Sequence, residues 1–240
     1  MLRNLKTLGL VLVTVCATGV MASSAAAVTD SFTTSGGGTA LLTGVSHDNA
    51  FTITNPSPVK FECTTAKLAG TIVNGSSEMT VDKEYSGLIN ATPHSTKCSS
   101  SIGEVTVDMN GCDYRLTGST TGMDGGQTDA TVWIECPSEP IKITGPSGVV
   151  VTIPGQTPKE GGVTYINLPN HSGGAAIKIT TTVTGITYSC HPTFICTLAA
   201  IPHHADNLDS TGTMTVTGYA DSDGLPTPVT EGARLGIAVS

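Results

Sequence analysis

Apolar and polar residues alternate with a period of two along much of the chain. The clearest stretch runs from Ile177 to Val183, and beyond Gly185 the apolar parity shifts by one position to Ile186 and Tyr188. A period of two is typical of a strand with one buried face, and a glycine at a parity shift is typical of a β-bulge. We therefore predict a strand over this stretch, interrupted by a bulge at Gly185.

The same strand signal recurs throughout the sequence. Threonine, valine, isoleucine, glycine and serine dominate, and 28 glycines and 13 prolines punctuate the 240 residues. β-branched residues favour a half-buried pleated surface, and frequent turn residues between short apolar runs are typical of sandwiches and barrels. The predicted fold class is all-β, an antiparallel sandwich or a barrel-like architecture stapled by disulfides. The last predicted strand is Arg234–Val239.

One hairpin can be predicted residue by residue. Cys112 and Cys136 are symmetric about Asp124, which lies in the turn-prone run Met123–Gly126. Directly opposed residues of an antiparallel pair have Cα atoms about 4.5–5.5 Å apart, within the range of a disulfide. We therefore predict a Cys112–Cys136 bridge, with residues 119–129 as the loop. The pairs that face each other on the cysteines' side are then Tyr114 with Ile134, Leu116 with Val132, and Gly118 with Ala130.

The remaining cysteines suggest two further bridges. Cys190 and Cys196 bracket five residues and can close a local loop, and Cys63 and Cys98 then pair by elimination. Six cysteines allow 15 connectivities, so this set is a hypothesis. Metal binding is the competing interpretation, but no CxxC pair or Cys/His zinc spacing occurs.

A weak internal repeat leaves the domain count open. Residues 61–64 and 194–197 share the pattern Phe-x-Cys-Thr, and each is followed by a Met-Thr-Val run. If this reflects a duplication, residues 28–140 and 163–240 are two related β units, joined by the Pro/Gly-rich stretch 141–162. The alternative is that both units pack as one domain, and the chain is long enough for either.

Residues 1–27 have the pattern of a secretory signal peptide. Arg3 and Lys6 supply a positive start, Leu8–Val15 supply an apolar stretch, and Ala25-Ala26-Ala27 offer a small-residue cleavage site. We therefore predict a secreted, extracytoplasmic product, whose destination is oxidising enough to keep disulfides formed.

Two alternatives to a cleaved signal peptide are disfavoured. A transmembrane anchor needs about 20 predominantly apolar residues, and this segment breaks into serines and alanines first. A lipoprotein site at Cys16 expects a small residue directly before the cysteine, where the sequence has Val15.

The charge balance argues against polyanionic partners. The formal net charge is −8, and removal of residues 1–27, with two cations and no anion, gives −8 − 2 = −10. Binding to a phosphate backbone depends on Lys and Arg. We predict no nucleic-acid partner and no membrane association once the signal peptide is removed, while the oligomeric state stays open.

No catalytic or cofactor-binding motif occurs. Nucleophile-elbow, zincin, P-loop and dinucleotide motifs are all absent, so we predict no catalytic residue, no cofactor and no metal site. Residues 209–213 approach the D-[ST]-G-[ST] loop of an aspartic protease, but one residue too many precedes the glycine. We interpret them as a turn before a strand over Met214–Tyr219.

Three short features could bind ligands. The first is a group of possible metal ligands: His191, His203, His204, Asp206 and Asp209. We interpret this group as a polar loop, because the adjacent side chains of His203 and His204 would point to opposite sides of an extended chain. Asp221 and Asp223 match a calcium loop in part, but Asp-Gly pairs are ordinary turn formers. Trp133 is an outward-facing aromatic on which a sugar ring could stack.

Several short runs resemble a known group of proteins. They are the Ala-rich N-terminal segment, Phe61–Thr64, the strand Gly111–Leu116 and the strand Gly185–Tyr188. Together they resemble exported, β-rich proteins of actinobacteria that carry no assigned activity. The resemblance implies a bacterial, extracytoplasmic protein and transfers no functional residue.

These observations favour a non-enzymatic secreted protein, structural or adhesive, or a small binding module at the cell surface. One alternative is an exported hydrolase whose site is assembled from distant loops, because catalytic groups converge in space and not in sequence. The other is a calcium- or carbohydrate-dependent binding protein acting through Asp221, Asp223 or Trp133.

Overall fold

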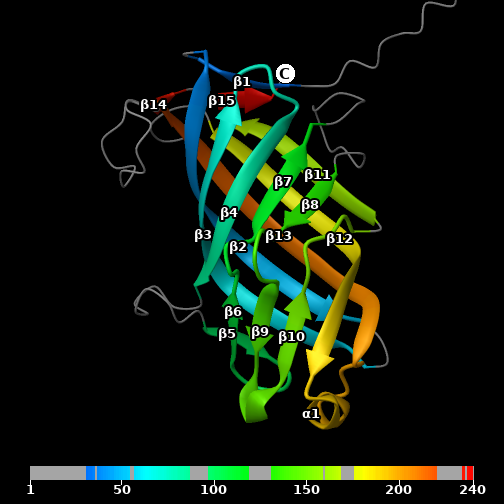
Figure 1. Ribbon diagram of the computed structural model, residues 1–240. Coiled ribbons are helices and arrows are strands. Elements are labelled where there is room, and N and C mark those ends of the chain that lie inside the picture. Colours follow the sequence, from blue (N-terminus) through cyan, green and yellow to red (C-terminus); the bar gives the residue numbers. More distant parts are fainter. Residues whose placement is uncertain are drawn as a thin grey trace, which may run out of the picture.

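The computed structural model describes nine segments of the chain, and within them the protein is almost entirely β-structure (Figure 1). The predicted signal peptide, the loop 119–129 and the pair Asp221 and Asp223 lie outside the described residues. The described segments are 31–35, 37–54, 57–86, 97–118, 131–158, 160–168, 176–220, 234–235 and 237–239.

Four long strands form the backbone of the fold. β2 (Thr39–Ile53), β3 (Val59–Val73), β12 (Ala176–His191) and β13 (His204–Ala220) lie side by side in the order β3-β2-β13-β12. All three pairings are antiparallel. Each strand is long enough to serve two tiers of the molecule, which are stacked along the strand direction (Figure 1).

In the lower tier, four short strands close the sheet into a barrel. The pairing runs from β3 through these strands back to β12, and every step is antiparallel. The result is a closed eight-strand barrel, which realises the barrel-like alternative predicted from the sequence. The closing strands are β5 (Lys97–Ser100), β6 (Val105–Asp108), β9 (Ile141–Thr144) and β10 (Val150–Ile153).

In the upper tier, the same four long strands carry a second set of partners. β4 (Glu78–Ser86), β7 (Asp113–Thr117) and β8 (Val132–Glu135) extend the sheet beyond β3. β11 (Glu160–Leu168) extends it beyond β12. Ile134 of β8 exchanges both backbone hydrogen bonds with Gln156, which lies in the segment between β10 and β11.

Short strands cover the upper end. β1 (Phe32–Thr34) pairs with β15 (Ile237–Val239), and β14 (Arg234–Leu235) pairs with β13. The predicted final strand is therefore split between two sheets.

The interior follows the period-two pattern of the sequence. Inward positions of the long strands are buried, for example Leu42, Phe61, Ile179 and Val216, and one apolar cluster runs through both tiers. Residues from both predicted units contribute to this cluster. The predicted junction, residues 141–162, supplies β9, the 3₁₀ turn η1 (Pro146–Gly148), β10 and the start of β11.

The predicted hairpin is confirmed by the register of β7 and β8. Tyr114 pairs with Ile134 and Leu116 pairs with Val132, as the symmetry of the cysteines requires. The predicted bulge at Gly185 is also confirmed, since the β12–β13 register shifts between Val183 and Ile186 and Gly185 has a φ of 70°.

All three predicted disulfides are present. The Cα–Cα distances are 4.5 Å for Cys63–Cys98, 4.2 Å for Cys112–Cys136 and 6.0 Å for Cys190–Cys196. The first joins β3 to β5 in the lower tier, and the third encloses the short helix α1 (Thr193–Leu198).

The turn interpretation of residues 209–213 is wrong, and the repeat pattern that the sequence left open has no structural counterpart. Residues 209–213 are not a turn, because they lie within the continuous strand β13, where pairing with both β2 and β12 outweighs their polar character. The repeat pattern is not structural, because residues 61–64 lie in β3 whereas residues 194–197 lie in α1.

No helix within the described segments is long and apolar enough to cross a membrane.

Candidate functional site at the helical end

Buried apolar side chains fill the interior of the described part of the protein. The cavity between β7, β8 and the long strands has a volume of about 20 Å³, roughly the space of one water molecule. Its lining is mainly apolar and includes Phe51, Leu116, Val183 and Met214. The interior therefore acts as a packed core.

The buried polar side chains of Ser46 and Asn49 are hydrogen-bonded within the protein. The hydroxyl of Ser46 lies 2.5 Å from Oδ1 of Asn49 and 3.0 Å from the carbonyl oxygen of Thr213. Nδ2 of Asn49 donates to the carbonyl of Cys63 at 3.3 Å. Ser46 and Asn49 are 0% and 2% exposed, so this cluster faces no solvent and has a structural role.

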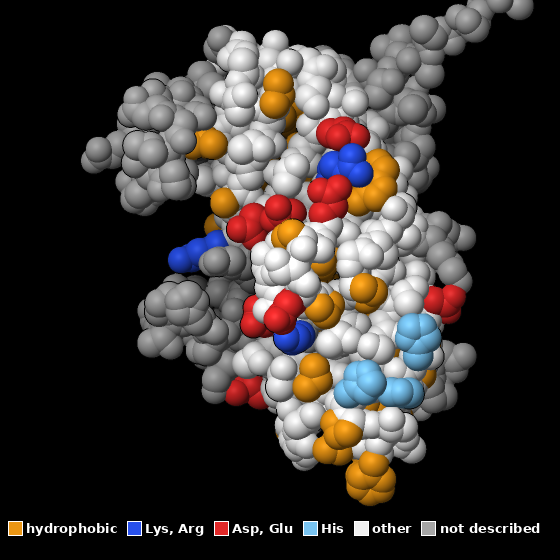
Figure 2. All heavy atoms as spheres, viewed as in Figure 1, with side chains coloured by type: hydrophobic (Ala, Val, Ile, Leu, Met, Phe, Trp, Pro, Cys, Tyr) orange, Lys and Arg blue, Asp and Glu red, His pale blue; other side chains and the backbone are white. Residues whose placement is uncertain are grey.

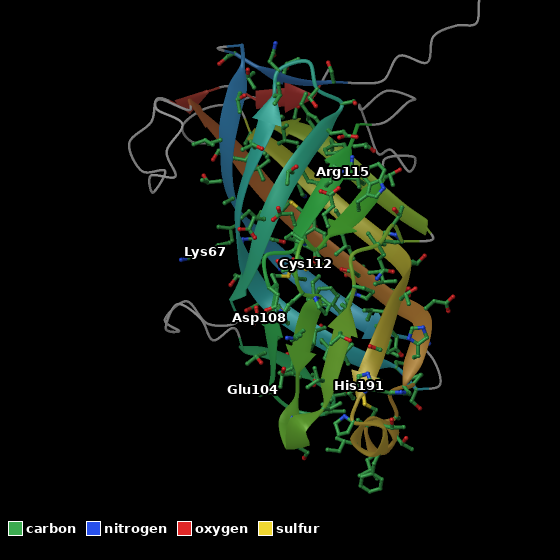
Figure 3. The ribbon with its side chains drawn as sticks, in the orientation of Figure 1. Lys67, Glu104, Asp108, Cys112, Arg115 and His191 are labelled. Carbon is green, nitrogen blue, oxygen red and sulfur yellow. A yellow bond between two sulfur atoms is a disulfide. The ribbon has the colours of Figure 1, made fainter. Side chains whose placement is uncertain are left out.

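Trp133, the candidate sugar platform, is engaged within the protein. The guanidinium carbon of Arg115 lies 4.3 Å from the centroid of the indole ring, a distance typical of a cation–π contact. The guanidinium is held in turn by Glu78 and Glu135, with N–O distances of 3.2 Å and 2.7 Å. Figure 3 shows Arg115 on the outer side of β7. One face of the ring is therefore covered, which leaves less surface for a sugar to stack on.

Nearby, burial and the neighbouring Glu135 carboxylate raise the pKa of Asp113. Asp113 and Glu135 are paired across the β7–β8 hairpin. Like charges directly opposed on two strands disfavour ionisation of both. The pair lies beside the Arg115–Trp133 contact on the same face of the hairpin.

Two of the predicted metal-ligand candidates come together. The rings of His191 and His203 meet edge to face with centroids 4.8 Å apart. Nδ1 of His203 lies 2.6 Å from the carbonyl oxygen of Cys190, and because a carbonyl only accepts, that nitrogen carries the proton and donates. Asp209 instead lies in β13, where its Oδ1 accepts from the backbone N–H of Gly185 at 3.4 Å.

Metal coordination is not assembled by these residues. Across the described part of the chain, no group of three or more His, Cys, Asp or Glu side chains is arranged to hold a metal ion. His203 lies in the bend directly before β13 and His204 begins that strand, so the polar loop predicted for these residues is replaced by strand from His204 onward.

The most unusual surface lies beside these histidines, on the helix α1. Phe194 and Leu198 are 73% and 71% exposed, more than any other large apolar side chain within the described segments. They are four residues apart and therefore share one face of the helix. The disulfide Cys190–Cys196 ties the helix to the end of β12, and the buried Cys196 fixes which face points outward.

The segments around α1 contain no acidic or basic residue other than histidine. We call this part of the molecule the helical end and define it as residues 144–149 and 190–203. β10 pairs Val150 with His191, which places η1 beside α1. The segments contain no Lys, Arg, Asp or Glu, and Pro146 adds a further exposed apolar residue. Figure 2 shows apolar side chains at the lower end of the molecule, with histidines directly above them, and Figure 3 places His191 at the same end.

Comparison of the chain with protein-family models, with curated proteins and with solved structures gives no significant match.

The sequence interpretation missed this surface. It placed residues 191–195 in a plain disulfide-closed loop, because a six-residue helix is too short to show a helical period. The available signal was the presence of Phe194 and Leu198 in a loop, where large apolar residues are seldom left without a reason.

Proposed function

We propose that this protein is a non-enzymatic, exported binding module that attaches to its partner through the helical end. The observation that carries the proposal is the rigid, uncharged protrusion on which Phe194 and Leu198 are 73% and 71% exposed. Exposed apolar side chains that are gathered at one place mark interaction surfaces in soluble proteins.

The rest of the described surface supports this choice. The cavity between β7, β8 and the long strands has room for about one water molecule, and Trp133 is covered on one face by Arg115. An extracytoplasmic location, a signal peptide over residues 1–27 and a bacterial source akin to the actinobacterial exported proteins belong to the same proposal. Three disulfides favour it, since such bonds persist in oxidising compartments.

The proposal is tested by retention on the native cell envelope. The double variant Phe194→Ser/Leu198→Ser removes the apolar protrusion from an exposed position, so the fold stays intact. The matched control is Val73→Ser/Ile166→Ser, which removes two apolar side chains that are 51% and 44% exposed in the upper tier.

We expect the Phe194→Ser/Leu198→Ser variant to appear in the soluble fraction, while the wild type and the control stay with the envelope. Both variants should melt within about 2 °C of the wild type, because surface substitutions change stability by less than about 0.5 kcal/mol. Equal retention of all three proteins would contradict the proposal.

A further inference from the structure

We propose that the partner of the helical end is a lipid surface, into whose interfacial layer Phe194 and Leu198 insert. This inference rests on the function proposed above and names the chemistry of its partner. It departs from the prediction of no membrane association, which rested on net charge, because the charge is absent from this end of the molecule.

The size of the surface argues against a second copy of the chain. Phe194 and Leu198 together present on the order of 300 Å² of apolar area, given about 150–250 Å² for one aromatic side chain. A stable protein dimer needs about 800 Å² from each partner. A lipid layer has no such requirement, because it deforms around a small protrusion and needs no complementary shape.

Several polar groups of α1 are already paired, which lowers the free-energy cost of moving the helix into a lipid interface. The backbone N–H groups of Ile195 and Cys196 donate to the carbonyl of Pro192, each at 3.0 Å. The hydroxyl of Thr197 donates to the carbonyl of Thr193 at 2.9 Å. In lipid, a backbone polar group without an internal partner is strongly unfavourable.

The C-terminal side of the helix is closed in the same way. The N–H groups of Ala199, Ala200 and Ile201 donate to the carbonyls of Ile195, Thr197 and Cys196, at 3.0, 3.1 and 2.8 Å. The helix end therefore brings few unpaired donors with it. A surface meant to recognise a folded protein usually offers such groups at its rim for hydrogen bonding.

The charge distribution predicts which lipids are preferred. The helical end contains no Lys, Arg, Asp or Glu within residues 144–149 and 190–203, while the whole chain has a formal net charge of −8. Glu104 lies in the turn whose Gly103 faces Pro146, so an acidic side chain sits near the rim. An anionic vesicle is therefore repelled, and a zwitterionic one is not.

The first experiment is flotation of the disulfide-intact exported protein with phosphatidylcholine vesicles. Wild-type protein and the Val73→Ser/Ile166→Ser control should float with the vesicles. Phe194→Ser/Leu198→Ser should lose at least about tenfold in partitioning, since burial of one Phe or Leu side chain corresponds to about one to two decades of affinity. Phosphatidylglycerol vesicles should bind less at low salt, with the difference shrinking at high salt.

A second experiment locates the contact. Trp133 is the single tryptophan of the chain, so Trp133→Phe gives a protein without tryptophan fluorescence. Phe194→Trp in that background should shift its emission to the blue on vesicles and be quenched by nitroxide-labelled phosphatidylcholine. Val73→Trp in the same background, at the opposite end of the molecule, should show neither effect.

The outcomes separate the lipid proposal from the proposed function. Vesicle binding that survives Phe194→Ser/Leu198→Ser would overturn insertion by the helical end. If the wild type binds no vesicle but the same variant abolishes retention on the native envelope, the partner is a protein and only the lipid proposal fails. If neither vesicle binding nor envelope retention depends on these residues, both proposals fail.

Discussion

At the scale of single residues, the buried polar groups fall into paired and unpaired classes. Asn49 belongs to the first, because its amide links Ser46 to the carbonyl of Cys63 in the middle of the barrel. Asn49→Ala should lower the free energy of unfolding by about 1–3 kcal/mol, since it leaves buried polar groups without a partner. Denaturant unfolding measures this, and an unchanged midpoint would contradict the structural role given to the cluster.

Tyr188 belongs to the second class. Its side chain is 0% exposed, and within the described segments its hydroxyl has no hydrogen-bond partner. Tyr188→Phe should therefore raise the free energy of unfolding, by about 1 kcal/mol, because an unpaired buried hydroxyl carries a desolvation cost. The same denaturant assay decides it. A loss of stability would show that the hydroxyl is in fact bonded.

The same residue gives a pH dependence. Burial raises the pKa of Tyr188 to about 12, above its ordinary value of 10. The folded state then holds the proton that the unfolded state releases, so the stabilisation is complete below pH 10 and is lost as the pH rises to 12. Its size is on the order of 2–3 kcal/mol. Chemical unfolding measured between pH 9 and 12 should show this decline.

Tyr188→Phe provides the control for that measurement. Burial also raises the pKa of Tyr165, so a residual slope is expected in the variant. The decline between pH 10 and 12 should nevertheless be shallower than in the wild type. Identical slopes would assign the alkaline loss of stability to other groups.

At the scale of elements, two of the disulfides should differ in role. Cys63–Cys98 should contribute more to the stability of the fold, and Cys190–Cys196 should contribute more to attachment. The Cys63–Cys98 bridge spans 35 residues and Cys190–Cys196 spans 6. In the chain-entropy model the first contributes about 3.8 kcal/mol and the second about 2.2 kcal/mol. Replacing Cys63 and Cys98 by serine should therefore lower the melting temperature more.

Function should follow the opposite order. Replacing Cys190 and Cys196 by serine frees α1 from β12 and should abolish retention on the envelope. The Cys63→Ser/Cys98→Ser protein should stay attached at temperatures where it remains folded. Circular dichroism melts and retention assays on the two variants give both orders, and loss of retention in the 63–98 variant alone would contradict the assignment.

The elements also show where sequence reasoning succeeds. The β7–β8 hairpin was predictable because Cys112 and Cys136 fix the register and a period of two fixes the facing pairs. The strand through residues 209–213 was not, because its polar residues form a strand only through pairing with β2 and β12. Such non-local pairing overrides local turn propensity.

At the scale of the whole molecule, the architecture depends on strand length. β2, β3, β12 and β13 have 15, 15, 16 and 17 residues, about three times the length of the usual strand, so each can hold two sets of neighbours. Along the chain, lower-tier and upper-tier strands follow an order that is symmetric about the β7–β8 hairpin. Glycines and prolines mark where strands end and do not mark which strands pair, so the sequence predicted the class but not this order.

The candidate site was hidden for a related reason. Phe194 and Leu198 are typical core residues, and only the packed barrel shows that the core is complete without them. Attachment through the helical end is therefore a proposal that depends on the assembled molecule.

A photo-crosslinking measurement tests attachment through the helical end most directly. Benzoylphenylalanine is placed at position 194 in one protein and at position 73 in another, and each is irradiated on the native envelope. We expect an adduct at position 194, with lipid mass if the partner is a bilayer, and none at position 73. An absence of adduct at 194, or equal adducts at both positions, would contradict attachment through the helical end.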